Sequence, residues 1–320
     1  MKKLAVNNKL VQVIAHRGAS SLAPENTLAA ASLAAELGAD MWEFDVRMTR
    51  DGELILMHDE TLSRTTNVQE LFPTRTPWRV EDFTLEEIRK LDAGSWFLHQ
   101  DPFGTIATGE VSLGQAQSYV REPVPTLKEA LMFTKETGLF ADIELKGESS
   151  FFGSSHRWRE MIECTVDLIH NLKLEDRVFL SSFTPEMIKY VKERASNIAT
   201  VLISVAMPSD PERILSEVCA DGIAIHSTAF NSTVSRRLAK AGYKVYVWTV
   251  NDQEEIRRFL QVPGLTGIIT DYPQRLLSVL GRVKKQPFNS KFANYRLCRC
   301  KVQSEKDGDG TAIHWNSGKT

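Results

Sequence analysis

Ionisable side chains follow directly after short apolar segments of this sequence. Residues 11–15 run into His16 and Arg17, and residues 54–57 run into His58. A basic side chain buried without a partner costs free energy, so its place at the end of a buried strand needs a chemical reason. Histidine titrates near neutral pH and can therefore give or take a proton during a reaction. His16 and His58 are thus candidates for a general acid and a general base.

Carboxylates form the second group of candidate residues. Glu43 and Asp45 lie two positions apart in one strand-like segment, and Glu144 and Lys146 do so in another. Side chains two positions apart on a strand point to the same face. Three converging carboxylates repel one another unless a cation lies between them, and hard oxygen ligands suit Mg²⁺ or Ca²⁺. Lys146 and Arg17 add positive charge that suits a phosphate. A single Glu-x-Asp pair would more simply be a solvated strand edge, but the whole set indicates a metal-assisted enzyme with an anionic small-molecule substrate.

Strand-like and helix-like segments alternate along the chain and must position these residues. Eight β-then-α units over about 270 residues predict an α/β fold, a (β/α)8 TIM barrel. An open doubly wound sheet is the alternative, but the sequence has no glycine-rich phosphate loop of the kind that is typical of it. Barrel enzymes carry their chemistry at the carboxyl ends of the strands, so the candidate residues would meet at one mouth. The expected strands are 11–15, 41–49, 140–146, 178–182, 199–204, 222–227, 244–250 and 267–273, with 53–59 as a hairpin partner of the second.

The first helix is expected over residues 28–37. Asn26 and Thr27 offer capping side chains before it, and Gly38 ends it.

Residues 60–124 interrupt the alternation between the second strand and its helix, which should begin near Pro125. The segment is too long for a simple loop, so we expect a small insertion at the barrel mouth. It should contain one helix, because Thr84 and Glu87 form a capping-box pattern before an apolar segment.

The end of the chain departs from the alternation as well. From residue 281 there is no apolar periodicity, and residues 282–301 are rich in Lys and Arg without an acidic residue. This composition predicts a disordered tail, with contact to anionic lipid as the alternative. We therefore divide the chain into a barrel of residues 1–280 and a tail of residues 281–320.

Composition excludes several other classes of protein. The 39 Lys and Arg residues nearly balance the 41 Asp and Glu residues, so the net charge of −2 argues against a nucleic acid as the partner. No apolar run approaches the roughly 20 residues that span a bilayer, and the N-terminus lacks the apolar core of a signal peptide. The four cysteines form no disulfide-scaffold pattern, so we expect reduced thiols in a cytoplasmic protein.

Several motifs together resemble one enzyme family. AHRGASSLAPENTLAA, WEFDVRMTRDGELILMHDETLSRTTN, LDAGSWF, VPTLKEAL, ADIELK, VWTVN and GIITDYP occur in order between about residues 11 and 280. This set is similar to the glycerophosphodiester phosphodiesterases. The resemblance implies a (β/α)8 barrel with a small insertion, one divalent cation, and hydrolysis of glycerophosphodiesters to an alcohol and glycerol 3-phosphate.

The resemblance also implies roles for single residues. In the family pattern, His16 matches the acid and His58 the base, and the attacking oxygen belongs to water or to the glycerol 2-hydroxyl. Glu25 and Asn26 would hold the loop of His16, and His226 and Asp271 match the pattern without a definite role. The remaining matches are the metal carboxylates Glu43, Asp45 and Glu144, the phosphate-binding Arg17, the active-site Lys146, and the aromatic wall of Trp248 and Phe183.

Three alternatives stay open at this point. A lysophospholipase D would use the same site on a diester with an acyl chain. A Schiff-base aldolase would use Lys146 without a metal. A non-catalytic binding protein would be favoured if a histidine or a metal carboxylate were missing, and none is. Residues 98–122 match no family motif, and head-group preference, the choice between Mg²⁺ and Ca²⁺ and the oligomeric state are left open.

Overall fold

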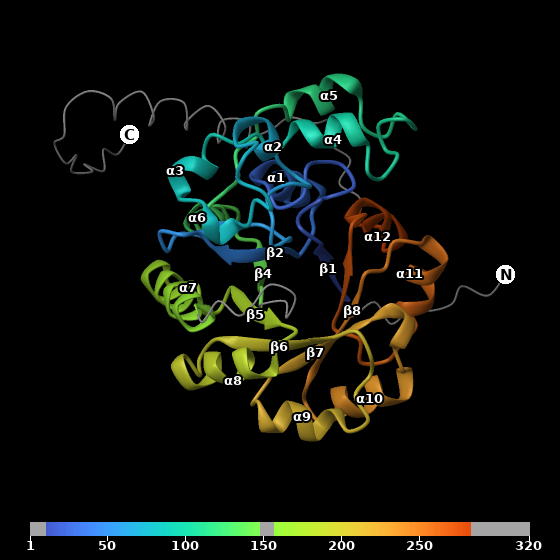
Figure 1. Cartoon of the computed structure of the whole chain (residues 1–320). Coiled ribbons are helices and arrows are strands. Elements are labelled where there is room, and N and C mark those ends of the chain that lie inside the picture. Colours follow the sequence, from blue (N-terminus) through green and yellow to red (C-terminus); the bar gives the residue numbers. More distant parts are fainter. Residues whose placement is uncertain (1–10, 148–156, 283–320) are drawn as a thin grey trace, which may run out of the picture. The chain divides into compact units, whose positions relative to one another are not determined.

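The computed structural model describes residues 11–147 and 157–282, and within them eight parallel strands close into a barrel (Figure 1). The barrel closes where β1 pairs with β9 on one side, Ala15 opposite Thr270, and with β2 on the other, Ile14 opposite Met41. The predicted (β/α)8 TIM barrel is therefore confirmed. Its strands are β1 (Gln12–Ala15), β2 (Met41–Met48), β4 (Phe140–Leu145), β5 (Val178–Ser182), β6 (Ala199–Ser204), β7 (Gly222–His226), β8 (Lys244–Trp248) and β9 (Gly267–Thr270).

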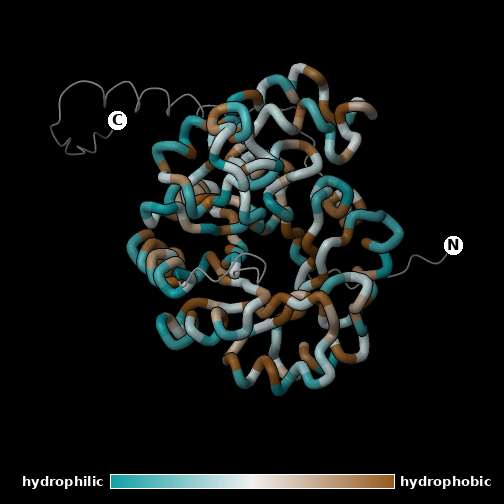
Figure 2. The backbone as a smooth tube through the Cα atoms, viewed as in Figure 1, coloured by the Kyte–Doolittle hydropathy of each residue, from teal (hydrophilic) through white to brown (hydrophobic). Residues whose placement is uncertain are grey.

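Helices surround the strands, and Figure 2 shows hydrophobic stretches along the strands with hydrophilic positions alternating along the outer helices. The predicted first helix is α1 (Leu28–Leu37): the Thr27 side chain accepts from the backbone N–H of Ala30, and Gly38 ends the helix with φ 93°. Asn26 was also expected as a cap, which is wrong, because its side chain binds Asp45 instead. The other helices that follow barrel strands are α6 (Leu127–Thr137), α7 (Trp158–Leu172), α8 (Pro185–Arg194), α9 (Pro211–Glu217), α10 (Ser232–Lys240), α11 (Gln253–Phe259) and α12 (Pro273–Val279).

An apolar layer inside the barrel supports a polar layer above it. Ile14, Met41, Phe179, Tyr246 and Ile269 belong to one buried cluster. Two residues after each of them comes a polar or amphipathic residue, on the same strand or just past its end. Residues two apart on a strand share a face, so this second residue also points inward and lies nearer the barrel mouth. Those following residues are His16, Glu43, Ser181, Trp248 and Asp271. The strand alternation therefore places the candidate residues at the carboxyl ends of the strands.

The segment between β2 and α6 contains more structure than the sequence predicted. β3 (Leu54–Leu56) pairs antiparallel with β2, as expected for a hairpin. The capping box at Thr84 is present before α3 (Leu85–Ile88), but the expectation of a single helix is wrong. Helices of four to six residues show too little periodicity to be recognised in a sequence. The further elements are α2 (Val68–Leu71), the 3-10 helix η1 (Val80–Asp82), α4 (Ser95–Gln100) and α5 (Leu113–Ser118).

The helices α2, η1 and α3 share a core of their own. Phe83 and Leu62 are fully buried in a cluster that reaches Ile55 on β3 and Val124 before α6. Apolar burial of this kind can hold short helices that would not be stable alone. The part of the segment that contains α2, η1 and α3 is therefore packed onto the hairpin of β2 and β3, which carries Asp45 and ends near His58.

Some predictions fall outside the described residues. The tail from residue 283 onward, with Cys298 and Cys300, is among them, so its disorder and the division into residues 1–280 and 281–320 stay predictions. Cys164 and Cys219 are free thiols. Across residues 11–147 and 157–282, none of the helices has the length and apolar character needed to cross a bilayer.

Candidate active site

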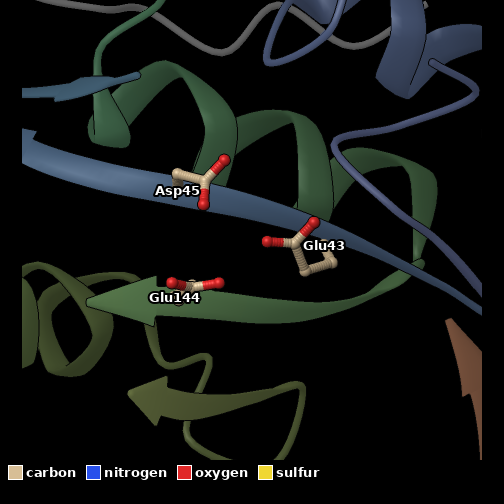
Figure 3. A group of neighbouring side chains, drawn as sticks. All are labelled: Glu43, Asp45 and Glu144. Atoms are coloured by element: carbon tan, nitrogen blue, oxygen red, sulfur yellow. The ribbon is translucent and has the colours of Figure 1, made fainter. Parts of the chain in front are cut away.

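Three carboxylates meet between two neighbouring strands. Glu43 and Asp45 come from β2, Glu144 comes from β4, and Asp45 and Glu144 are directly opposite in the strand register. All three residues are buried, and a ligand oxygen of each lies within 4.8 Å of those of the others (Figure 3). The sequence spacing therefore predicted their common face correctly.

This cluster fits a divalent cation. Burial raises the pKa of Glu43 well above its usual value, and the charges of Asp45 and Glu144 add to the effect. Oε1 of Glu43 is buried and has no hydrogen-bond partner within the described part of the chain. A cation between the oxygens would offset the repulsion among the buried carboxylates and would give Oε1 of Glu43 a partner. Carboxylates are the ligands that hard divalent cations take. The cluster can thus hold one metal ion.

Two cations from the protein flank the carboxylates. Nζ of Lys146 lies 2.8 Å from Oδ1 of Asp45 and also contacts Glu144, and Nε of Arg17 lies 3.4 Å from Oδ2 of Asp45. Burial alone would raise the pKa of Asp45, but the charges of Lys146 and Arg17 outweigh it and hold that pKa below its usual value. Burial alone would lower the pKa of Lys146, but Asp45 and Glu144 raise it. A protonated Lys146 cannot attack a carbonyl, which disfavours the aldolase alternative.

The His16 ring is held by a residue that follows the last strand of the barrel. Its Nδ1 lies 2.6 Å from Oδ1 of Asp271, just after β9. Burial alone would raise the pKa of Asp271, but the contact with His16 and a hydrogen bond from Asn251 lower it. The ionised carboxylate accepts, so Nδ1 carries the proton. Nε2 then remains for chemistry, and it lies 3.9 Å from Oε2 of Glu43.

His58 is held in a similar way after the β3 hairpin strand. Its Nδ1 lies 2.6 Å from Oδ1 of Asp59. Its backbone carbonyl accepts two hydrogen bonds from Arg47, at 3.0 Å from Nε and 2.8 Å from Nη2. The ring and the backbone of His58 are thus each fixed by a charged partner, and Nε2 is again left over.

The turn after β1 joins the histidine to the metal cluster. Arg17 adopts φ 55°, and its backbone N–H donates to Oε2 of Glu43 at 2.7 Å. Gly18 follows with φ 84°, and a Cβ there would lie 2.6 Å from the Cβ of Ala30, so only glycine fits. Asn26 ties this turn to β2, because its side chain donates to Oδ2 of Asp45 and accepts from the Asp45 backbone N–H.

The aromatic residues form a separate group on later strands. The rings of Phe183 and Trp248 meet edge to face at 5.4 Å, and the ring of His226 meets Trp248 at 4.9 Å. Trp248 is fixed further by a hydrogen bond from Nε1 to the carbonyl of Ala224. Within the described residues, no hydrogen bond or ion pair links this group to the carboxylates. The structure therefore does not join Phe183 and Trp248 to the charged cluster.

Sequence reasoning missed several residues of this region. Asp142 lies two residues before Glu144 on the same strand face, where alternation could have revealed it. It is buried, which raises its pKa well above the usual value, and it accepts a hydrogen bond from Ser181 at 2.5 Å. Arg47, and Arg64 in the HDETLSRTTN motif, were not recognised as partners of the site.

Comparison with known proteins identifies the family. The model of the glycerophosphoryl diester phosphodiesterase family matches residues 16–275. The chain belongs to this family. Members with similar sequences are the glycerophosphodiester phosphodiesterases of Caldanaerobacter subterraneus, 33% identical over 84% of this chain and 97% of that protein, and of Bacillus subtilis, 34% identical over 82% and 84%. The chain is accordingly an enzyme, a phosphoric diester hydrolase, which argues against the alternative of a non-catalytic binding protein.

A solved structure of a similar protein also agrees with the fold. The Oleispira antarctica phosphodiesterase, in complex with its product sn-glycerol-3-phosphate, is 30% identical and superposes with a TM-score of 0.71 over 86% of this chain and 99% of that one. The two proteins therefore share the fold over 86% of this chain.

Proposed function

We propose that this enzyme hydrolyses glycerophosphodiesters to an alcohol and glycerol 3-phosphate by two-histidine acid–base catalysis with one divalent cation. The observation that carries the proposal is the pairing of both histidines. Nδ1 of His16 faces Asp271 and Nδ1 of His58 faces Asp59, each at 2.6 Å. Each ring keeps Nε2 for the substrate. The glycerol 3-phosphate in the Oleispira antarctica structure supports the product class.

Glu43, Asp45 and Glu144 would hold the cation, which we propose to be Mg²⁺ or Ca²⁺. The unpartnered Oε1 of Glu43 and the all-oxygen ligand set support a hard cation there. When bound, the cation would act as a Lewis acid that neutralises charge on the phosphodiester.

Other residues would bind the substrate. Arg17 and Lys146 lie beside the carboxylates and are charged, so they can hold phosphate oxygens of the diester. Trp248 and Phe183 would form an apolar wall for the uncharged part of the substrate.

Two proton transfers complete the reaction. The attacking oxygen belongs to water or to the glycerol 2-hydroxyl. Nε2 of His58 takes the proton of this oxygen as the new oxygen–phosphorus bond forms. Nε2 of His16 gives a proton to the alcohol oxygen as its bond to phosphorus breaks. If the 2-hydroxyl attacks, the product is a cyclic phosphate that water opens in a second round. Asp59 and Asp271 stabilise the protonated rings and hold them in place.

Release of glycerol 3-phosphate from glycerophosphocholine and glycerophosphoethanolamine tests this function. We expect release with Mg²⁺ or Ca²⁺, loss with excess chelator, and recovery when the metal is added back. Release that persists in chelator would contradict the metal site. Absence of release from both diesters, with choline released from lysophosphatidylcholine, would instead identify a lysophospholipase D.

A further inference from the structure

Arg64 lies between two carboxylates just beyond the catalytic histidine His58. To Asp59 it donates from Nε at 2.7 Å and from Nη2 at 3.0 Å. To Glu25 it donates from Nη1 at 2.8 Å and from Nη2 at 2.7 Å. The planar guanidinium thus makes a two-point contact with each carboxylate, a geometry that Lys cannot reproduce.

Each of these carboxylates also holds a residue of the active site. Oδ1 of Asp59 lies 2.6 Å from Nδ1 of His58, and Oε1 of Glu25 accepts from Nη1 of Arg17 at 2.9 Å. One continuous chain of charged hydrogen bonds therefore runs from His58 through Asp59, Arg64 and Glu25 to Arg17.

We propose that Arg64 is a positioning residue of this enzyme, one that aligns His58 through Asp59 and Arg17 through Glu25. The inference rests on the function proposed above for His58 and Arg17. It assigns to Arg64 the task of holding the base and the phosphate-binding side chain in one fixed arrangement.

The balance of charge supports this role. Arg17 and Arg64 oppose Glu25 and Asp59, two cations against two anions. The Glu25 side chain is only 8% exposed, so its charge needs close partners. Burial alone would raise the pKa of Glu25, but the hydrogen bonds from Arg64 and the charge of Arg17 lower it, and the group is ionised. Without Arg64, Glu25 would draw Arg17 more strongly away from the phosphate, and Asp59 would lose the group that orients it.

A direct contact between Arg64 and substrate fits the geometry less well. Arg has five N–H donors, and four hydrogen bonds to the two carboxylates already occupy most of them. The bound carboxylates also offset its charge. Arg64 would therefore act through its neighbours.

Double-mutant cycles test this proposal in the full chain. Arg64→Ala should lower kcat for glycerophosphocholine by about 10–100-fold, because His58 loses its alignment, and should also raise KM by several-fold, because Arg17 is drawn away from the phosphate. The same change should cost several-fold less in the Asp59→Asn background and in the Glu25→Gln background, because one of the two routes through which Arg64 acts is already broken in each. Arg64→Gln, which keeps the length of the side chain, repeats the cycles if Arg64→Ala folds poorly. Arg237→Ala is the matched control, because it removes an exposed ion pair between Arg237 on α10 and Glu212 on α9.

The outcomes separate cleanly. Additive losses with either partner would mean that Arg64 stabilises the fold or acts independently, and would overturn the proposal. An unchanged kcat, with or without a rise in KM, would mean that Arg64 does not align His58, and would overturn the proposal too. Failure of the proposed function has a different signature, since the wild-type chain itself would then release no glycerol 3-phosphate, or His58→Ala would keep full activity.

Discussion

Nδ1 of His16 lies 2.6 Å from Oδ1 of Asp271, although 255 residues separate them in the chain. His16 follows β1 and Asp271 follows β9, the first and last strands of the barrel, which pair in register up to Ala15 and Thr270. Closure of the barrel is therefore what completes this part of the active site. The same hydrogen bond leaves Nε2 of His16 on the side of Glu43, one of the three carboxylates of the proposed metal site.

Asp271→Asn should impair catalysis without a loss of the fold. The amide has no negative charge to fix the Nδ1–H tautomer of His16 or to stabilise the protonated ring. We expect kcat to fall by about 10²-fold or more with little change in KM. Steady-state kinetics with glycerophosphocholine measure this, with Asp167→Asn, at an exposed ion pair on α7, as the control. A variant with near-normal kcat would show that Asp271 does not orient His16.

Glu144→Gln should weaken binding of the metal ion. The change removes one charged oxygen from the ligand set and leaves its size unchanged. Isothermal titration with Mg²⁺ or Ca²⁺ should show clear binding to the wild type and at least about tenfold weaker binding to the variant. At 100 times Kd the ion should also stabilise the wild type by about 2.7 kcal/mol. Glu193→Gln on α8, an exposed site, should behave as wild type, and equal affinity of all three proteins would place the metal elsewhere.

Glu25 should make stability depend on pH in the acid range. Its pKa is lowered from 4.5 in the folded protein by Arg64 and Arg17, against the effect of burial. A group with a lowered folded pKa stabilises the protein above its unfolded pKa, and this contribution is lost as pH falls through the folded value. Urea unfolding of wild type and Glu25→Gln should therefore show a constant stability difference between about pH 6 and 7 that shrinks below about pH 4.5. A difference that grows on acidification would contradict the ion-pair chain.

Phe183→Ala should raise KM more than it lowers kcat. Phe183 is 42% exposed and packs on Trp248, so its loss would remove apolar surface offered to the substrate. We expect KM for glycerophosphocholine to rise by about three- to tenfold. Phe140→Ala is the matched control, because Phe140 is 37% exposed at the amino end of β4, away from the strand ends that carry the site. Equal KM values for both variants and wild type would remove Phe183 from the substrate site.

The alternation of segments was enough to predict the barrel, and the two-residue spacing was enough to place Glu43 beside Asp45. These features are local, because a strand fixes the faces of its side chains by itself. The short helix α2 was missed because it is stabilised by the shared core around Phe83 rather than by its own periodicity. The helices α4 and α5 have six residues each, too few to show a periodicity.

The partners of the catalytic residues were harder to predict. Asn is a residue type that often caps helices, yet in the folded chain the Asn26 amide donates to Asp45 and does not cap α1. Arg64 lies 39 residues from Glu25, and nothing in either segment alone indicates that they meet. Such pairings depend on tertiary structure, so the sequence predicted the reacting groups better than the groups that hold them.

The assignment of acid and base to the two histidines is tested most directly by changing the leaving group. A choline alkoxide must receive a proton as it departs, whereas p-nitrophenolate leaves without one. Hydrolysis of glycerophosphocholine and of a p-nitrophenyl ester of glycerol 3-phosphate should be measured for wild type, His16→Ala and His58→Ala. We predict that His16→Ala loses about 10²–10⁴-fold on the choline ester but retains most activity on the p-nitrophenyl ester, and that His58→Ala loses activity on both. Equal losses of His16→Ala on the two esters, or near-normal turnover by either variant, would contradict the account.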